Sequence, residues 1–391
     1  MTAGRFLWRL CRKGARLVSV SLRYDFGKNW QEFAARHLGE DAIRQSQDRI
    51  AEFLRLSSLK GLSLLDIGCG SGVHSLAAHR LGAASVTSFD YDPNSVQAAD
   101  QVRRYGGAPE NWRVMQGSVL DAAFMQELAP ADIVYSWGVL HHTGDMWNAV
   151  RNAAIPLKPD GALYIALYAS EMYVDPPAEY WLEVKRKYNA RGPIGRRLTE
   201  WWHVVRFHLV PALKAGRNPL QVIRDYGDRG MTLMTDVRDW LGGYPMDFAG
   251  LRETCDFCRT ELGLELVNVK AGQGCTEFLF CRPGAERWQA IEKARTLVPA
   301  RGPFRHHLEL CYAFDIPELA GQSDDESNPY RSRLMLYEDG VPLGFAHSEI
   351  YEVHTHGRGR FLHQRGSVYF SASDNSDPTK NGRAYAYCVP Y

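Results

Sequence analysis

Short apolar runs alternate with helical stretches over residues 25–282 of the chain. This alternation is typical of an α/β domain in which most strands of the sheet are parallel. The last two runs are separated by Gly272 and Gly274, so we expect them to close the sheet as a hairpin. The pattern therefore predicts a doubly wound, mainly parallel sheet of seven strands. The expected strands are residues 62–67, 85–89, 112–116, 133–136, 163–167, 264–269 and 277–281.

A different pattern interrupts this domain between residues 170 and 249. Four tryptophans stand among many basic side chains there, and prolines recur as breakers of regular structure. The tryptophans are Trp181, Trp201, Trp202 and Trp240. We expect a helical insert that forms a lid over the domain.

The pattern changes again after a linker at residues 283–302, which contains an expected helix. From 303 to 391 the chain carries β-rich runs, and Asp339-Gly340 is a strong hairpin signal. We expect a small all-β sandwich or jelly roll. The β-rich runs are residues 333–337, 348–354 and 367–370.

The composition is that of an ordinary folded protein. Of 391 residues, 45% are hydrophobic and 23% are charged, which excludes a mostly disordered chain. Lys and Arg number 46 against 45 Asp and Glu, and this balance argues against a nucleic-acid partner bound by overall positive charge. No apolar run approaches the roughly 20 residues of a membrane-spanning helix. We therefore expect no nucleic-acid partner and no membrane span.

Residues 1–24 carry basic side chains and no acidic one. Apolar residues at helical spacing, with arginines opposite, predict a basic amphipathic helix. Two interpretations stay open: the helix packs on its own domain, or it lies on an anionic membrane surface. The arginines break the apolar core of a secretory signal, and the eight thinly spread cysteines indicate a reducing compartment. The predicted location is the cytoplasm, either free or at the inner membrane surface.

A glycine-rich turn follows the first expected strand. Asp66, Gly68, Gly70 and Gly72 stand in the stretch LLDIGCGSG, directly before a helical run. Glycines at this spacing let the backbone approach a ligand at the N-terminus of a helix. Asp90 ends the next expected strand, where a carboxylate can accept hydrogen bonds from both ribose hydroxyls of a nucleoside. A nucleoside-containing ligand is therefore expected.

The motif GxGxG, with an aspartate just upstream, differs from the GxGxxG fingerprint of dinucleotide sites. It resembles the first motif of class I S-adenosylmethionine (SAM)-dependent methyltransferases, over residues 60–170 and 249–282. Three further stretches are similar to that family in the same order: QGSVLD at 116–121, SWGVLHH at 136–142 and LKPDG at 157–161. In the family they are the adenine-contacting turn, the loop after the fourth strand and the turn before the fifth.

The resemblance implies SAM as cofactor and a role for eight residues. It puts the aspartate and glycines of the first motif around the methionine part, Asp90 on the ribose, and Ser118 with Val119 beside the adenine. The family often has Asp where Ser118 stands, and a hydroxyl can still bond the adenine amino group. The cofactor-binding residues implied are Asp66, Gly68, Gly70, Gly72, Asp90, Ser118, Val119 and Ser136.

His141 and His142 close the motif after the fourth strand. Methyl transfer is an in-line displacement, so the protein mainly positions the acceptor and removes its proton. Histidine titrates near neutrality, so either residue can be the general base for a hydroxyl acceptor. The alternative is that both only shape the loop.

The acceptor is inferred from the insert and the tail. Basic residues exceed acidic ones over 185–229, which favours an anionic acceptor or marks a solvated surface. The run at 369–378, with Asn381 and Arg383, looks similar to tail segments of bacterial surface-polysaccharide biosynthesis enzymes. The leading hypothesis is therefore an O-methyltransferase for a hydroxyl of a saccharide or saccharide-lipid. The alternatives are a quinone-like or small aromatic hydroxyl, and a SAM-binding scaffold that recruits a glycan-synthesis partner.

The tail also has a second interpretation, as a structural or dimerising domain that would make the protein a homo-oligomer. No metal site is expected. The four cysteines 255, 258, 275 and 281 have zinc-like spacing, but we place one pair in a helix and the other in a hairpin. His354 and His356 share one face of an expected strand without a carboxylate at a useful spacing.

Overall fold

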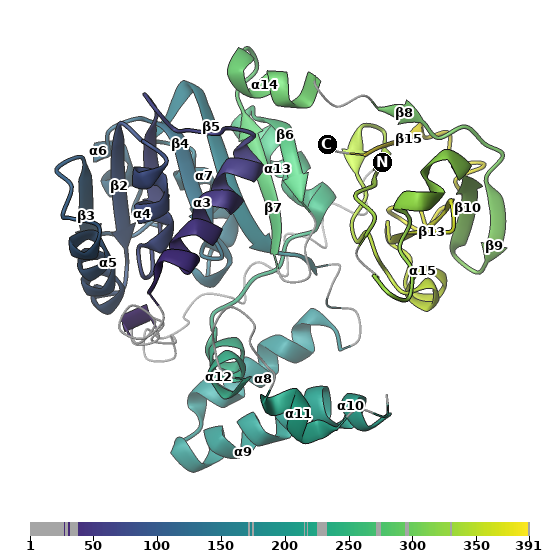
Figure 1. Ribbon diagram of the computed structural model, residues 1–391, viewed down its shortest axis with the longest axis horizontal. Helices are drawn as coiled ribbons and strands as arrows, with labels where there is room; N and C mark the ends of the chain where they lie inside the picture. The colour runs from purple at the N-terminus through teal and green to yellow at the C-terminus, as the bar shows by residue number, and fades with distance from the viewer. Residues whose placement is uncertain are drawn as a thin grey trace, which may run out of the picture.

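The computed structural model describes residues 27, 30–31, 38–170, 173, 176–214, 216, 218–224, 233–270, 275–293, 297–328 and 331–389. Seven strands form one sheet in the order β3-β2-β1-β4-β5-β7-β6 (Figure 1). The first five are parallel, and β7 runs antiparallel to β5 and β6. The predicted doubly wound sheet is confirmed. Its strands are β1 (Ser63–Ile67), β2 (Ser85–Asp90), β3 (Trp112–Gln116), β4 (Ala131–Trp137), β5 (Leu157–Tyr168), β6 (Glu265–Lys270) and β7 (Cys275–Cys281).

Helices cover both faces of this sheet, which explains why its strands are nearly continuous apolar runs. Neighbouring residues of one strand enter different cores: Leu64 packs with one group of helices and Leu65 with the other. The first face carries α3 (Glu40–Leu54), α4 (Val73–Arg80), α5 (Pro93–Tyr105) and α14 (Glu286–Lys293). The second carries α6 (Ala122–Glu127), α7 (Met146–Ala153) and α13 (Leu251–Leu262).

The chain between β5 and α13 is helical. A bridge between Ala169 and Ala249 holds its two ends together, so the insert leaves and re-enters at the carboxyl end of β5. Val204, Val237 and Leu241 contribute to an apolar core of its own. The helices are α8 (Ala178–Ala190), α9 (Pro193–Val204), α10 (Val210–Lys214), α11 (Pro219–Arg224) and α12 (Leu233–Gly242), with a π-helical turn at Val205–Leu209.

Two antiparallel sheets make up the C-terminal part, as the β-rich pattern predicts. Their orders are β13-β14-β10-β9 and β12-β11-β15-β8. Phe314 and Phe370 from the first sheet pack with Leu336 and Tyr385 from the second in one core. The strands are β8 (Val298–Pro299), β9 (Arg305–Leu308), β10 (Cys311–Asp315), β11 (Met335–Glu338), β12 (Val341–Pro342), β13 (Phe361–Gln364), β14 (Ser367–Phe370) and β15 (Tyr385–Cys388).

The turn at Asp339-Gly340 joins β11 and β12 as the sequence predicts. Both residues have positive φ, 51° and 75°, which is the backbone of the tight hairpin turn that Asp-Gly favours. The second sheet already includes β8, which lies before the expected domain start at 303.

The expected strand at 348–354 is wrong. Residues Ile350–Thr355 form a short helix, α15, and only Val353 in it is buried. A run of this length with one buried residue fits either period, so its pattern alone could not separate helix from strand. His354 therefore does not share a strand face with His356.

The stretch LKPDG also differs from expectation. It belongs to β5 itself, where the register shifts between Ala131, which pairs with Leu157, and Ile133, which pairs with Ala162. Residues 1–24, and with them the basic amphipathic helix, lie outside the described residues. Within the described part of the chain, no helix has the length and apolar character needed to cross a membrane.

Candidate active site

The glycine-rich loop lies between the end of β1 and the start of α4. Gly68, Gly70 and Gly72 have φ angles of 70°, 53° and 81°, in the left-handed region that favours glycine. A Cβ atom on Gly68 would lie 2.3 Å from Cγ1 of Val139, so the loop after β4 approaches this turn closely. Each of the three glycines therefore lies close to another segment of the chain, and a side chain at any of them would be crowded.

Two carboxylates flank this loop. Asp90, the last residue of β2, accepts hydrogen bonds from the backbone N–H of Gly70 at 3.0 Å and of Asp92 at 2.9 Å. Asp92 caps α5, so the turn after β2 is held in place. Asp66 is buried, and Ser75 Oγ donates to its Oδ2 at 2.5 Å. Burial raises the pKa of Asp66 to about 7.

Two described residues near the N-terminus, which the sequence did not single out, lie beside the turns after β1 and β2. The backbone N–H of Gly27 donates to Asp92 Oδ2 at 2.9 Å. Trp30 lies against Gly70, where a Cβ atom would come within 3.0 Å of the indole. Trp30 and Gly27 therefore form one wall of the site.

The other three cofactor residues implied by the resemblance, Ser118, Val119 and Ser136, have different surroundings and hydrogen-bond partners. Ser118 lies after β3, and its hydroxyl accepts the N–H of Leu120 at 3.2 Å. Val119 is buried, and its carbonyl accepts from Asn152 Nδ2 at 2.9 Å. Ser136 is fully buried within β4, and its hydroxyl donates to the carbonyl of Ile67 at 3.1 Å. The Ser136 side chain thus ties two strands together at the base of the glycine loop.

His141 and His142 lie in a 3-10 turn, Leu140–His142, just after β4. His141 is fully buried, its ring lies 4.0 Å from that of Tyr168, and neither ring nitrogen has a hydrogen-bond partner among the described residues. Burial lowers the pKa of His141 well below its ordinary value, which keeps the ring neutral.

His142 is half-buried, and its Nδ1 lies 2.8 Å from the carbonyl oxygen of Pro245. A carbonyl only accepts, so Nδ1 carries the proton and donates it. In the neutral ring, Nε2 is then the basic nitrogen. The backbone N–H of Asp247 also donates to the His141 carbonyl at 2.7 Å, so the chain leaving the insert fixes this turn twice.

Tyr168 packs against both histidine rings, and Tyr173, Trp240 and Phe248 pack around Tyr168 and one another; all four rings are half-buried. Tyr173 and Trp240 are nearly parallel, at 7° between ring planes and 5.8 Å between centroids. We call these four residues the aromatic cluster. Sequence reasoning singled out only Trp240, because the four residues come from segments far apart in the chain.

Lys185 of α8 is a fully buried cation behind this cluster. Its Nζ donates to the carbonyl oxygen of Trp240 and lies 3.8 Å from the centroid of that ring. Burial lowers the pKa of Lys185 to about 7. No pattern in the sequence distinguishes this lysine from its neighbours Arg186 and Lys187, which are surface residues paired with Glu183.

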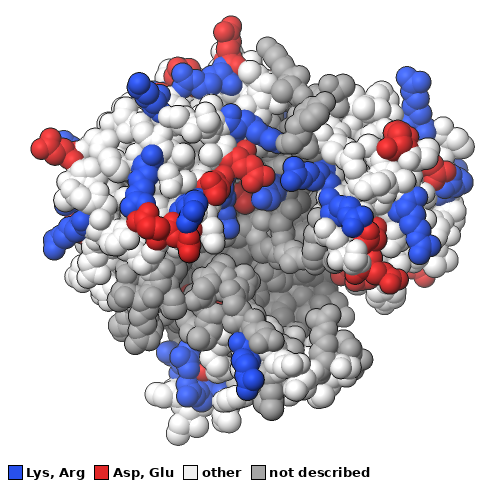
Figure 2. Space-filling view, in the orientation of Figure 1, with Lys and Arg blue, Asp and Glu red and all other residues white. Residues whose placement is uncertain are grey.

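Ion pairs reduce the positive charge that the insert shows in the sequence. Glu183 pairs with Arg186 at 2.8 Å and with Lys187 at 3.2 Å, and Glu200 pairs with Arg238 at 3.1 Å. On the rest of the face shown in Figure 2, basic and acidic side chains alternate over the large sheet and the C-terminal part. The surface interpretation of the basic excess is therefore the better supported one.

Residues 36–210 match the model of a methyltransferase-domain family. The chain carries a class I SAM-dependent methyltransferase domain. The match includes α3, the glycine loop, Asp90 and both histidines. The cofactor of this class is SAM.

Curated relatives are similar over this domain only. The ubiquinone biosynthesis O-methyltransferase of Methylobacterium nodulans is 32% identical over 136 residues, which are 35% of this chain and 48% of that protein. The 27-O-demethylrifamycin SV methyltransferase of Amycolatopsis mediterranei is 34% identical over 128 residues, 32% of this chain and 44% of that protein. The chain thus spans less than half the length of these relatives.

Solved structures overlap with a larger share of the chain at lower identity. An O-methyltransferase family protein from Burkholderia thailandensis aligns with 61% of this chain and 57% of its own, at 16% identity and a TM-score of 0.39.

Proposed function

We propose that the chain transfers the methyl group of SAM to a hydroxyl of a small aromatic, quinone-like molecule. The observation that carries this proposal is the histidine pair at the end of β4 with the aromatic cluster packed beside it. A planar acceptor can stack on half-buried rings and bring its hydroxyl to a histidine nitrogen. The curated relatives named above are O-methyltransferases of ubiquinone biosynthesis and of a rifamycin.

The residues around the glycine loop fit the cofactor. We assign the backbone at Gly68, Gly70 and Gly72 to the methionine part, and Asp66 offers a carboxylate for its ammonium group. Asp90, which ends β2 beside the glycine loop, is assigned to accept hydrogen bonds from the ribose hydroxyls. Ser118 and Val119 are assigned to the adenine. When bound, SAM supplies an electrophilic methyl group, and its sulfur keeps the electron pair of the broken bond.

His142 is the residue we assign as general base. The Pro245 carbonyl accepts the Nδ1 hydrogen bond, so the basic nitrogen of the neutral ring is Nε2. Nε2 accepts the proton of the acceptor hydroxyl as the new oxygen–carbon bond forms, and then releases it to water. His141 is buried too deeply to exchange protons with solvent. We assign it a positioning role, in which its neutral ring supports His142 and Tyr168.

We assign the entry of the acceptor to a cavity beside Tyr173 of the aromatic cluster. A cavity of about 560 Å³, within the usual size range of small-molecule sites, opens there between the insert and the C-terminal domain. It is lined by Ser170, Tyr173, Pro177, Ala178, Glu179, Thr355, His356, Arg358 and Asn375. The insert at 170–249 would then act as the acceptor lid, and the C-terminal domain would supply polar contacts to the far end of the acceptor.

A saccharide acceptor is the weaker hypothesis, although the sequence alone ranked it first. The two curated relatives named above are O-methyltransferases of ubiquinone biosynthesis and of a rifamycin by their names, and the insert's basic excess is partly neutralised. Glycan recognition by the tail, a cytoplasmic location, membrane contact through residues 1–24 and self-association stay predictions.

The test compares methyl transfer to the two classes of acceptor in separate reactions. The full chain is incubated with methyl-labelled SAM and either an alkyl-substituted catechol or N-acetylglucosamine, and products are identified by mass spectrometry. We expect a methyl ether of the catechol only. Methylation of the sugar alone would overturn the aromatic assignment and restore the saccharide hypothesis. Binding of SAM without transfer to either would favour the scaffold hypothesis.

A further inference from the structure

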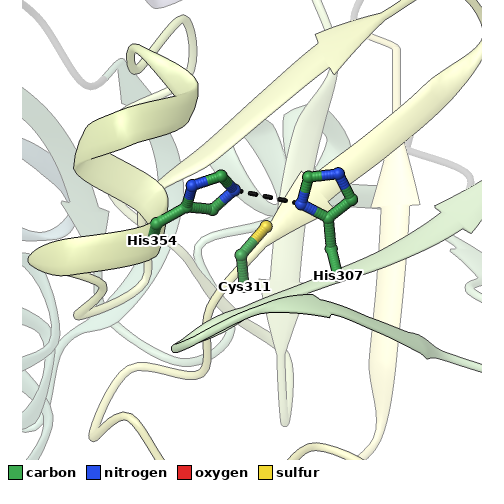
Figure 3. A group of neighbouring side chains, drawn as sticks. All are labelled: His307, Cys311 and His354. Atoms are coloured by element: carbon green, nitrogen blue, oxygen red, sulfur yellow. Dashed lines mark hydrogen bonds between the residues drawn. The ribbon is translucent and has the colours of Figure 1, made fainter.

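Three metal-ligating side chains converge in the C-terminal domain, apart from the proposed active site. They are His307 of β9, Cys311 of β10 and His354 of α15 (Figure 3). His307 Nδ1 and His354 Nε2 face each other at 3.0 Å, and the Cys311 thiol points toward the same place. The three ligand atoms all lie within 4.8 Å of one another. No other group of three such side chains was found in the described part of the chain.

The backbone brings these residues together without help from a ligand. Leu308 pairs with Cys311 and His306 with Tyr312, so His307 is the extra residue of a β-bulge. A bulge re-aims a side chain out of the regular alternation of a strand. The N–H of Leu310 donates to the carbonyl of His354 at 3.3 Å, which ties the β9–β10 turn to α15. The Tyr369 ring meets the His307 ring edge to face at 5.0 Å.

The spacing suits a tetrahedral ion. Zinc takes histidine nitrogen at about 2.0–2.1 Å and cysteine sulfur at about 2.3 Å, so neighbouring ligand atoms lie roughly 3.3–3.6 Å apart. The two nitrogens, at 3.0 Å, need to separate by only a few tenths of an ångström. Two imidazoles and one thiolate are donors that bind zinc in preference to calcium or magnesium, because calcium and magnesium take oxygen ligands.

A simple hydrogen bond between two imidazoles explains only part of this arrangement. It accounts for His307 and His354 but not for the thiol, whose hydrogen bond to the carbonyl of Tyr312 is long, at 3.7 Å. Cys311 is fully buried, whereas His307 is exposed, so an ion placed between them would have protein on one side and solvent on the other.

We propose that His307, Cys311 and His354 form a zinc-binding site with a fourth position open to water or an exogenous ligand. The His307 and His354 rings supply neutral nitrogens, and Cys311 loses its proton to solvent when the ion binds. This departs from the sequence-based expectation of no metal, because the ligands lie on a bulge, a buried strand and an unexpected helix. The site belongs to the C-terminal domain and does not depend on the proposed methyl transfer.

The first test measures zinc affinity of the full chain after removal of metal by a chelator. Competition with a chromophoric zinc indicator should give one ion per chain. Loss of a residue that only hydrogen-bonds to a metal ligand weakens a metal site by about 10–100-fold, so loss of a ligand itself, in His307→Asn or His354→Asn, should weaken binding by at least about 100-fold. The control His306→Asn changes an exposed neighbour on the same strand that contacts Glu309 and Tyr312 instead, and should bind as the wild type does.

A second measurement identifies the sulfur ligand. Cobalt(II) in place of zinc should give a thiolate-to-metal charge-transfer band that disappears in Cys311→Ser. His307→Asn keeps the test valid if the buried Cys311 variant does not fold, because His307 is exposed. Unchanged zinc affinity in His307→Asn, or a cobalt spectrum without the thiolate band, would overturn the proposal.

Discussion

Asp66 is the residue whose protonation should govern cofactor affinity near neutral pH. The residue is 2% exposed, and burial raises the pKa of its carboxyl to about 7. Below that pH the carboxyl is neutral and cannot attract the ammonium group of SAM. As the pH rises from 6 to 8 the ionised fraction grows about tenfold, so SAM affinity should rise by up to about tenfold. Isothermal titration calorimetry across this range measures it.

The matched variants are Asp66→Asn, which should lose the pH dependence, and Asp100→Asn, which should keep it. Asp100 lies on the surface of α5, where it pairs with Arg103 and Arg104. An Asp66→Asn variant with the same pH slope as the wild type would remove Asp66 from the cofactor site.

Asp90 should contribute to SAM affinity at any pH near neutrality. Replacement by Asn removes the charge and one of the two oxygens, so it loses the charged acceptor for the ribose hydroxyls and one of the two backbone hydrogen bonds. Hydrogen bonds to a charged group contribute about 1.5–3 kcal/mol, so Asp90→Asn should weaken SAM binding by roughly 10–150-fold. Calorimetric titration with Asp100→Asn as the control checks this. A change of less than about twofold, on the scale of RT, would contradict the ribose assignment.

At the scale of elements, Lys185 of α8 is buried against Trp240 of α12. Burial holds its pKa at about 7, below its ordinary value of 10.5, so the folded state binds fewer protons than the unfolded state between these pH values. The free energy of unfolding contributed by Lys185 therefore rises with pH from about 7 to about 10. Lys185→Met removes this dependence.

We expect Lys185→Met to be more stable than the wild type at pH 7. That advantage should shrink by up to about 1.4 kcal/mol for each pH unit above 7. Urea denaturation at several pH values measures the difference. Lys187→Met makes the same change on the exposed side of α8 and should give a pH-independent difference. Equal pH dependence in both variants would show that Lys185 is not buried as a titrating group.

The large sheet could be predicted from the sequence because each strand is a compact apolar run bounded by glycine or polar turns. The glycine loop and Asp90 followed from it, since motif spacing fixed them to strand ends. Tyr173, Phe248 and Lys185 could not be predicted in this way. Tyr173 and Phe248 pack with Tyr168, and Lys185 packs with Trp240, only once the insert has folded, and nothing in their local sequence marks those contacts.

The same limit applied to the C-terminal domain. Residues 350–355 have a pattern short enough to fit a helix or a strand, and they form a helix in which only Val353 is buried. The cluster of His307, Cys311 and His354 depends on that helix. Motif spacing could not reveal this cluster, because His354 lies 43 residues after Cys311 in the sequence.

At the scale of the whole molecule, the C-terminal domain packs against the methyltransferase domain at α13. Met335 and Val341 of the C-terminal domain pack against the core beneath α13, and Arg252 lies 3.7 Å from the buried Glu338. Placing a charge in this contact by Val341→Glu should cost about 1–3 kcal/mol of docking energy. Differential scanning calorimetry should then resolve separate unfolding transitions for the two domains.

The control for this experiment is Tyr351→Glu, an equal charge change at an exposed position of the same domain. It should leave the wild-type profile unchanged. A Val341→Glu profile identical to that of the wild type would mean that this contact does not hold the domains together.

The most direct test of the central claim is the rate of methyl transfer to an alkyl-substituted catechol by the full chain and by His142→Gln. Loss of a positioned general base lowers turnover by about 10²–10⁴-fold, and SAM affinity should stay within about twofold of the wild type. His306→Gln, in the other domain, should retain full turnover. Equal turnover by His142→Gln and the wild type would contradict the assignment of His142, and with it the proposed active site at the end of β4.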